Sequence, residues 1–216
     1  MAVRDALLAL LTAGPAYGFQ LHGGLAVRTG GRRTVNVGQT YATLDRLAKQ
    51  RLVESAGSTD DGLPLHRLTA TGADAAEAWL HGADAAGADP WDETIDRVLI
   101  ARSLPDYDAE AVIATERGRW LARRSEASDA ASRPVGPEHP RGNELSADDP
   151  GTNAAETALA RLAAAAGLAR ADAALAWLDV VDSETRVTLA PRAQRPKRGR
   201  RPGATPKAGA QASASA

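Results

Sequence analysis

Residues 37–53, VGQTYATLDRLAKQRLV, divide their side chains between two faces of a helix. At about 100° per residue, the apolar side consists of Val37, Tyr41, Leu44, Leu47 and Ala48. The opposite side consists of Gln39, Ala42, Thr43, Arg46, Lys49 and Gln50. Taken alone, this pattern is typical of an ordinary surface helix with a solvated polar face.

Two further helices precede this stretch. AVRDALLALL, residues 2–11, has leucines at helical spacing and is stopped by a Gly-Pro turn. YGFQLHGGLAVRTGG, residues 17–31, is a softer helix, because Gly23 and Gly24 each cost about 1 kcal/mol relative to alanine. The sequence therefore predicts three consecutive helices.

After the third helix the periodicity changes. Residues 52–57 and 63–69, LVESAG and LPLHRLT, read as short extended segments around the turn-rich STDDG, which predicts a hairpin. TGADAAEAWL, residues 71–80, returns to a helical pattern, with Thr69 or Thr71 available as its N-cap. The predicted order is helix, helix, helix, hairpin, helix.

This order indicates a winged helix-turn-helix, in which the third helix enters the DNA major groove and the hairpin wing touches the backbone. Glutamine pairs with adenine, arginine with guanine, and threonine or alanine meets a thymine methyl, so Gln39, Ala42, Thr43 and Arg46 are candidate base readers. Lys49, Arg32 and Arg33 are candidate phosphate contacts. The predicted DNA-binding residues are Arg32, Arg33, Gln39, Thr40, Tyr41, Ala42, Thr43, Arg46, Lys49 and Arg67.

The rest of the chain is predicted to be helical. We place the DNA-binding domain at residues 1–83 and a helical region at 84–189. Within that region, residues 128–152 hold prolines and glycines but few large apolar side chains, which predicts a loop or disordered insert. The helix expected over 153–184 has an apolar stripe too broad for one neighbour, so we expect a second packing partner.

Charge is strongly partitioned along the chain. Residues 1–81 carry 8 basic and 7 acidic side chains, whereas residues 82–189 carry 11 and 20. Residues 190–216 carry 7 basic side chains and no acidic one, and this Pro/Gly/Ala-rich tail is predicted to be disordered.

Composition excludes several classes of function. Apolar runs are short and no signal peptide is recognisable, so a soluble cytoplasmic protein is expected, associated with the nucleoid. With no cysteine and only four scattered histidines, we expect no metal or cofactor. No pairing of a nucleophile with a base and no phosphate loop is recognisable, so an enzyme is not expected. Abundant alanine and arginine are typical of a GC-rich bacterial genome.

Three blocks resemble the signature of the PadR family of bacterial transcriptional regulators. They are ALLALLTAGPAYGFQL, VGQTYATLDRLAKQRLVES and HRLTATGADAAEAWL, in the family's order and spacing, spanning roughly residues 2–81. The acidic helical region is similar to the variable C-terminal helices of this family, which form the homodimer. The resemblance implies a mainly α fold, with an N-terminal winged helix-turn-helix of three helices and a β-hairpin wing, followed by a C-terminal helical dimerisation region.

The chain departs from the family pattern in places. Thr40 stands where an apolar residue is usual, Ala42 where proline is frequent, and Arg51 where a helix-ending glycine is common. The wing matters more, because its strand begins Leu-Pro-Leu where relatives often carry basic and aromatic residues, and its tip holds Asp60 and Asp61. The wing is thus an unfavourable phosphate contact.

The tail offers a second DNA signal. RPKRGRRPG, residues 195–203, resembles the AT-hook, which enters the minor groove of A/T-rich DNA, although Arg201 interrupts its Arg-Gly-Arg-Pro core. The alternative is a solubilising tail without sequence preference. The basic tail residues in question are Arg195, Lys197, Arg198, Arg200 and Arg201.

Trp91 and Trp120 are candidate effector-binding residues, because some PadR-like regulators bind flat aromatic molecules between the dimer helices. Packing in a core or dimer interface is the alternative, and it is the one we favour for Trp177.

Together these features predict a homodimeric, sequence-specific regulator of transcription, most simply a repressor. It would bind an inverted-repeat operator in double-stranded DNA and be released by a small-molecule effector. The alternative is an architectural, nucleoid-associated protein that binds DNA without choosing an operator.

Overall fold

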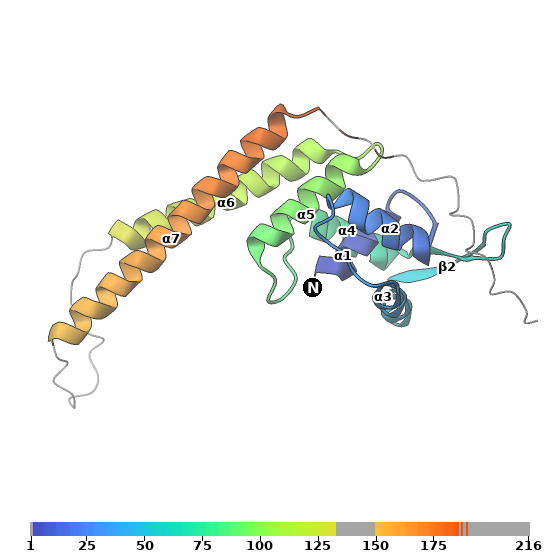
Figure 1. Ribbon diagram of the computed structural model, residues 1–216, viewed down its shortest axis with the longest axis horizontal. Helices are drawn as coiled ribbons and strands as arrows, with labels where there is room; N and C mark the ends of the chain where they lie inside the picture. Colours follow the sequence, from blue (N-terminus) through green and yellow to red (C-terminus); the bar gives the residue numbers. More distant parts are fainter. Residues whose placement is uncertain (1, 133–149, 186, 188, 190–216) are drawn as a thin grey trace, which may run out of the picture.

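The computed structural model describes residues 2–132, 150–185, 187 and 189. The N-terminal domain contains α1 (Ala2–Leu11), β1 (Ala16–Tyr17), α2 (Gly18–Arg28), α3 (Val37–Lys49), β2 (Val53–Ser58), β3 (Pro64–Leu68) and α4 (Ala70–Leu80). The C-terminal region contains α5 (Pro90–Ser103), α6 (Ala109–Ser132) and α7 (Pro150–Ser183). Figure 1 shows the domain at one end of the molecule and the last two helices extending from it. The predicted mainly α fold with a winged helix-turn-helix is confirmed.

Helix α1 forms the centre of the N-terminal domain. Ala6, Leu7, Leu8 and Ala9 are all fully buried, so the helix is covered on every side. A helix that is apolar all round belongs inside a core. Helices α2, α4 and α5 pack around it, and the chain leaves α1 through Gly14, whose φ of 122° suits a residue without a side chain.

The wing is part of a small antiparallel sheet. Within the described residues the strand order is β1-β3-β2, with Glu54 opposite Arg67 and Tyr17 opposite Leu65. The hairpin β2–β3 was predicted, but β1 was not, because two residues are too few to show an alternating pattern. Thr69 is the N-cap of α4, as one of the two predicted alternatives had it.

Helix α5 joins the domain to the C-terminal region. It packs against α1, α2 and α4 on one side and against α6 on another, and most of its residues are buried. Asp89 caps its first turn and Pro90 stands at its start, where a missing N–H does no harm.

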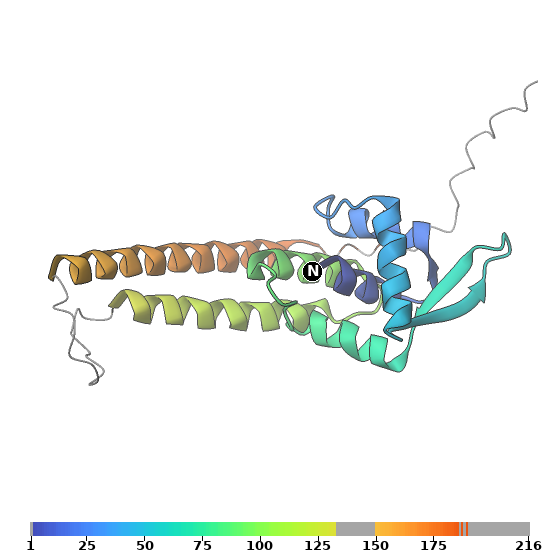
Figure 2. The ribbon, with the colours of Figure 1, turned by 90° about the horizontal axis from the view of Figure 1, so that it is seen from below.

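Helices α6 and α7 run side by side in opposite directions and form a long arm (Figure 2). Two exposed ion pairs join them, Arg117 with Asp179 at 2.6 Å and Arg124 with Asp172 at 2.5 Å. None of the described helices is long and apolar enough to cross a bilayer.

The insert predicted over residues 128–152 is too wide at both ends. Residues 128–132 continue α6, and residues 150–152 already belong to α7. Small polar residues and alanine can extend a helix that is already packed, so low apolar content misplaced the boundaries. The rest of the insert lies outside the described residues.

Candidate nucleic-acid interface

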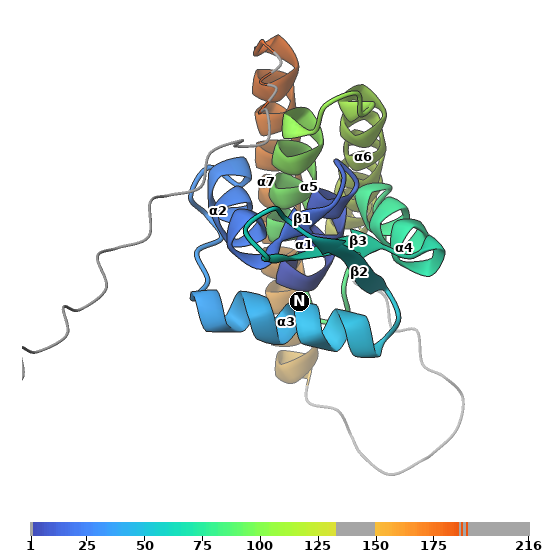
Figure 3. The same cartoon turned by 90° about the vertical axis from the view of Figure 1, so that its right-hand side faces the viewer.

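Helix α3 lies along the outer side of the N-terminal domain, with α2 near one end and β2 near the other (Figure 3). Its start is fixed by a reciprocal cap. The Gln39 N–H donates to Asn36 Oδ1 at 2.7 Å, and the Asn36 N–H donates to Gln39 Oε1 at 3.2 Å. This capping box satisfies two amide donors that the first turn of a helix would otherwise leave open.

Replacing the cap residue should weaken α3 selectively. We expect Asn36→Ala to lower the free energy of unfolding by about 1 kcal/mol, because the first-turn amide loses its acceptor. Thermal unfolding followed by circular dichroism measures this, with Thr34→Ala, an exposed residue of the same loop, as the control. Equal stability of the two variants would show that the cap does not stabilise the helix.

The buried face of α3 differs from the one predicted on the helical wheel. Its buried residues are Thr40, Thr43, Leu44 and Leu47. This set has the spacing i, i+3, i+4, i+7 of a single stripe. Val37 and Tyr41 were predicted to pack inward, yet 39% and 41% of their surfaces are exposed. The wheel placed the apolar side nearly one residue away from where the packing lies.

Thr40 and Thr43 are therefore corrections to the predicted DNA-contacting set. Thr40 is fully buried, and its Oγ1 lies 3.3 Å from His22 Nδ1. Thr43 donates to the Gln39 carbonyl at 2.8 Å. A β-branched threonine places a methyl group in the core while its hydroxyl bonds locally, so neither side chain faces a DNA ligand.

Tyr41 crosses onto α2 at a glycine. A Cβ added at Gly18 would lie 2.6 Å from Tyr41 Cε1, which is closer than atoms can approach. Gly18 thus leaves room for the ring, while the exposed part of Tyr41 stays on the outer surface beside α3. The Tyr-Gly pair before α2 and the tyrosine in α3 have a shared structural reason.

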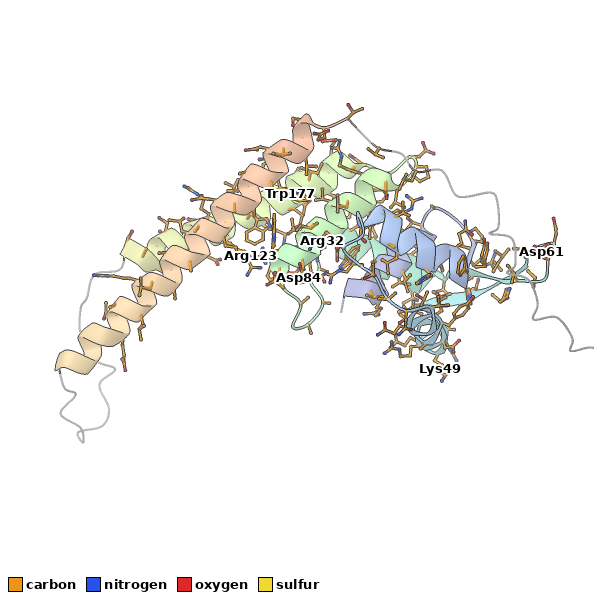
Figure 4. The ribbon with its side chains drawn as sticks, in the orientation of Figure 1. Arg32, Lys49, Asp61, Asp84, Arg123 and Trp177 are labelled. Carbon is orange, nitrogen blue, oxygen red and sulfur yellow. The ribbon has the colours of Figure 1, made fainter. Side chains whose placement is uncertain are left out.

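The outward face of α3 presents Gln39, Ala42, Arg46 and Lys49, all exposed. Arg46 lies along the helix, where its Nε donates to the Ala42 carbonyl at 3.2 Å and its Nη2 donates to Thr43 Oγ1 at 3.1 Å. These bonds hold the guanidinium group near the surface and leave other N–H donors of the group directed outward. In Figure 4, Lys49 marks the end of the helix away from the body of the protein.

Gln39 has a more limited capacity than predicted. Its Oε1 already accepts from the cap residue, so a bidentate pair with adenine would require breaking that bond. Its amide group remains able to donate one hydrogen bond to a base edge.

Arg32 and Arg33 were predicted to contact phosphates, and the structure instead pairs them with α5. Arg32 Nη2 lies 2.8 Å from Asp92 Oδ1, and Arg33 Nε lies 2.5 Å from Asp96 Oδ2. Figure 4 shows Arg32 beside the C-terminal region rather than beside Lys49. These arginines join the loop before α3 to the helix that leads to the arm.

The electrostatics of this link reflect burial. Asp96 is fully buried, and burial raises the pKa of its carboxyl although Arg33 opposes the shift. Burial lowers the pKa of Arg33, but its hydrogen bond to Asp96 and the nearby carboxylates outweigh this and raise it overall. Both partners are charged at neutral pH when the loop and α5 are in contact.

The wing carries little positive charge. Arg67 Nε lies 2.8 Å from Glu54 Oε1 across the hairpin, so its charge is already paired. Asp60 and Asp61 form the exposed tip, and Figure 4 shows Asp61 at the end of the hairpin farthest from the domain. The acidic tip predicted from the sequence would repel a phosphate backbone.

The tryptophans pack together where α5, α6 and α7 meet. Trp91 contacts Trp120 and Trp177 edge to face, with ring centroids 6.0 and 5.4 Å apart. Trp120 is buried, and its indole N–H donates to Thr94 Oγ1 at 2.9 Å. Packing therefore accounts for all three, and an effector role for Trp91 and Trp120 stays a prediction. The basic tail residues 195–201 lie outside the described residues.

Comparisons with known proteins give one match of domain size. Residues 7–78 match the transcriptional regulator PadR-like family. No curated protein matches the chain.

Solved structures with similar folds include a transcriptional regulator from Clostridium thermocellum, with 21% identity, a TM-score of 0.33, and coverage of 35% of this chain and 74% of that one. Bacillus subtilis PadR in complex with operator DNA has 17% identity, a TM-score of 0.34, and coverage of 82% and 94%. The same protein in complex with p-coumaric acid has 16% identity, a TM-score of 0.33, and coverage of 85% and 97%.

Proposed function

Residues 7–78 form a domain of the transcriptional regulator PadR-like family, and from this premise we propose that the chain is a homodimeric, operator-specific DNA-binding regulator that acts as a repressor in the cytoplasm. The observation that carries the proposal is the outward face of α3. Gln39, Arg46 and Lys49 line that face, while the buried stripe fixes the helix on the core. A rigid helix with amide and guanidinium donors on its free side fits the major groove.

The wing supports a division of labour in which α3 provides most of the specific contact. The hairpin places carboxylates at its tip and pairs its arginine with Glu54, so it adds little attraction for phosphates. Lys49 at the end of α3 supplies a phosphate contact instead.

Dimerisation is proposed through the arm. Leu159 and Leu162 on α7 have 66% and 68% of their surfaces exposed, and Leu121 on α6 is half exposed. Large aliphatic side chains that face water along a paired helix favour a further helix as partner, and a second copy of this chain supplies one. Two copies related by a two-fold axis would place their α3 helices about 34 Å apart on an inverted repeat.

Regulation is proposed through α5. The Arg32–Asp92 and Arg33–Asp96 pairs join the loop before α3 to α5, and Trp91 on α5 packs against Trp120 and Trp177. A small aromatic effector bound near these tryptophans would release the operator only if it binds more tightly to an arrangement in which α3 is displaced.

The proposal is tested by removing the base-reading donors. We expect Gln39→Ala combined with Arg46→Ala to abolish preference for the operator while leaving dimerisation intact, because each good base contact contributes about 1–3 kcal/mol of discrimination. Operator affinity is measured by gel shift with the DNA upstream of the protein's own gene, and dimerisation by sedimentation.

The control is Arg124→Ala, an exposed arginine of the arm that pairs with Asp172. Unchanged operator affinity of the double variant would remove α3 from its proposed role. Loss of the wild-type complex to excess competitor DNA would instead favour the architectural alternative, in which the chain binds DNA without choosing a site.

A further inference from the structure

The chain after α7 returns to the N-terminal domain and is held there by a clasp of three residues, Arg28, Ser103 and Leu189. Arg28 Nη2 donates to the Leu189 carbonyl at 2.9 Å, and Arg28 Nη1 donates to Ser103 Oγ at 3.0 Å. The Leu189 N–H donates to the Ser103 carbonyl at 3.3 Å. Both backbone polar groups of Leu189 are thus bonded, one to α2 and one to α5.

Further contacts support the clasp on both sides. Arg28 also donates to the Ser103 carbonyl, and Arg102 donates to the Glu184 carbonyl, just after α7 ends. A guanidinium group that bonds a backbone carbonyl recognises the course of a chain and not the identity of its side chains. The clasp therefore fixes where the chain beyond it begins.

The segment beyond the clasp is the most basic part of the protein. Residues 190–216 carry 7 basic side chains and no acidic one. The clasp lies on Arg28 in the last turn of α2, and the loop that leads to α3 starts at the next residue. We infer that the clasp directs this tail onto the phosphate backbone of DNA that flanks the half-site read by α3 of the same protomer; the inference rests on the proposed function.

Chain length sets the reach of the tail. The cluster Arg195–Arg201 begins six residues and ends twelve residues after Leu189. Even fully extended, those segments span only about 20–40 Å. This is about one turn of DNA. A tail held at Leu189 therefore samples phosphates next to its own half-site at a high effective concentration.

The charge of the tail supplies the attraction that the wing lacks. Each phosphate neutralised by lysine or arginine releases counterions and adds about 0.9 to the slope of log affinity against log salt. Replacing Arg195, Lys197, Arg198, Arg200 and Arg201 by glutamine in the full chain should flatten this slope by about 2–4. Operator binding at several salt concentrations measures the change, and an unaltered slope would overturn the inference.

A longer tether tests the clasp itself. A Gly-Ser insert of about 27 residues between Leu189 and Ala190 makes the chain to Arg198 about four times longer, so the tail's effective concentration should fall about eightfold. The same Gly-Ser segment placed after Ala216 is the matched control, because it leaves the tether unchanged. Arg28→Met should lower operator affinity as the insert does, and the insert keeps the test valid if Arg28→Met does not fold. Equal operator affinity for insert and control would contradict the role of the clasp.

The position of the tail on DNA can be mapped directly. The chain has no cysteine, so Ala204→Cys offers a single attachment site for an iron chelate that cleaves nearby DNA. We expect cleavage within about one turn outside each half-site, and the insert between Leu189 and Ala190 should broaden it. Cleavage of the protein's own acidic region, residues 82–189, with no DNA cleavage would show that the tail folds back on the arm and would overturn the inference.

The two proposals fail in different ways. If the α3-dependent footprint is present but the flanks are not cleaved, the clasp inference fails alone. If the footprint itself is absent, the proposed function fails, and this inference fails with it.

Discussion

Arg97→Met is expected to lower the free energy of unfolding by about 3–5 kcal/mol, because it leaves buried carboxylates without their cation. Arg97 is fully buried on α5. Its Nη1 donates to Glu116 Oε1 at 2.9 Å, its Nη2 donates to Asp84 Oδ1 at 2.7 Å, and its Nε donates to the Trp79 carbonyl at 2.6 Å. One side chain therefore joins α4, the following loop, α5 and α6.

The matched control is Arg124→Met. Arg124 forms an ion pair with Asp172 at 2.5 Å, but both side chains are about half exposed, so the change should cost less than about 1 kcal/mol. Urea denaturation followed by circular dichroism measures both variants. Similar losses for the two would show that burial of the Arg97 cluster adds nothing to its contribution.

The same cluster predicts how stability depends on pH. Burial raises the pKa of Glu93 and of Asp5, so the folded protein holds those protons more tightly than the unfolded chain does. Stability should therefore fall as pH rises from the ordinary carboxyl range through the raised pKa values. Removing the cation at Arg97 raises the pKa of the neighbouring carboxyls further, so the loss caused by Arg97→Met should be smaller in acid than at neutral pH.

Periodicity predicted the helices and the hairpin because each element's own residues carry the signal. The leucines of α1 and the Thr69 cap of α4 are examples, since both depend on neighbours within a few positions. The order of these elements, together with the three family blocks, was enough to predict the winged helix-turn-helix.

The remaining features depend on contacts between distant residues. Nothing near Arg33 in sequence reveals that Asp96 will meet it, so a basic residue before α3 was interpreted as a phosphate contact. Thr43 looked like a polar surface residue, although its methyl group suits a core as well as its hydroxyl suits water. Charged residues in a buried helix are ambiguous in sequence, because their partners decide whether they face solvent or one another.

Gly72→Ala is expected to destabilise the N-terminal domain by about 3 kcal/mol, the upper end of the usual range for an overpacked core. In sequence a glycine near the start of a helix looks like a weakness, since alanine is the better helix former. The structure gives it a reason, because a Cβ at Gly72 would lie 1.8 Å from the Leu52 carbonyl oxygen. That oxygen is backbone and also accepts from the Thr69 N–H at 3.1 Å, so it cannot rotate aside.

Alanine at this position must therefore push α4 away from the start of β2 and loosen the wing together with the Thr69 cap. Gly118→Ala provides the matched control, because Gly118 lies inside α6 with nothing within 4 Å of an added Cβ. That change should stabilise the protein by about 0.5–1 kcal/mol, since it removes only the entropic cost of glycine in a helix. Chemical denaturation of the two variants should give shifts of opposite sign, and a stabilised Gly72→Ala protein would show that α4 and β2 do not approach as closely as the structure places them.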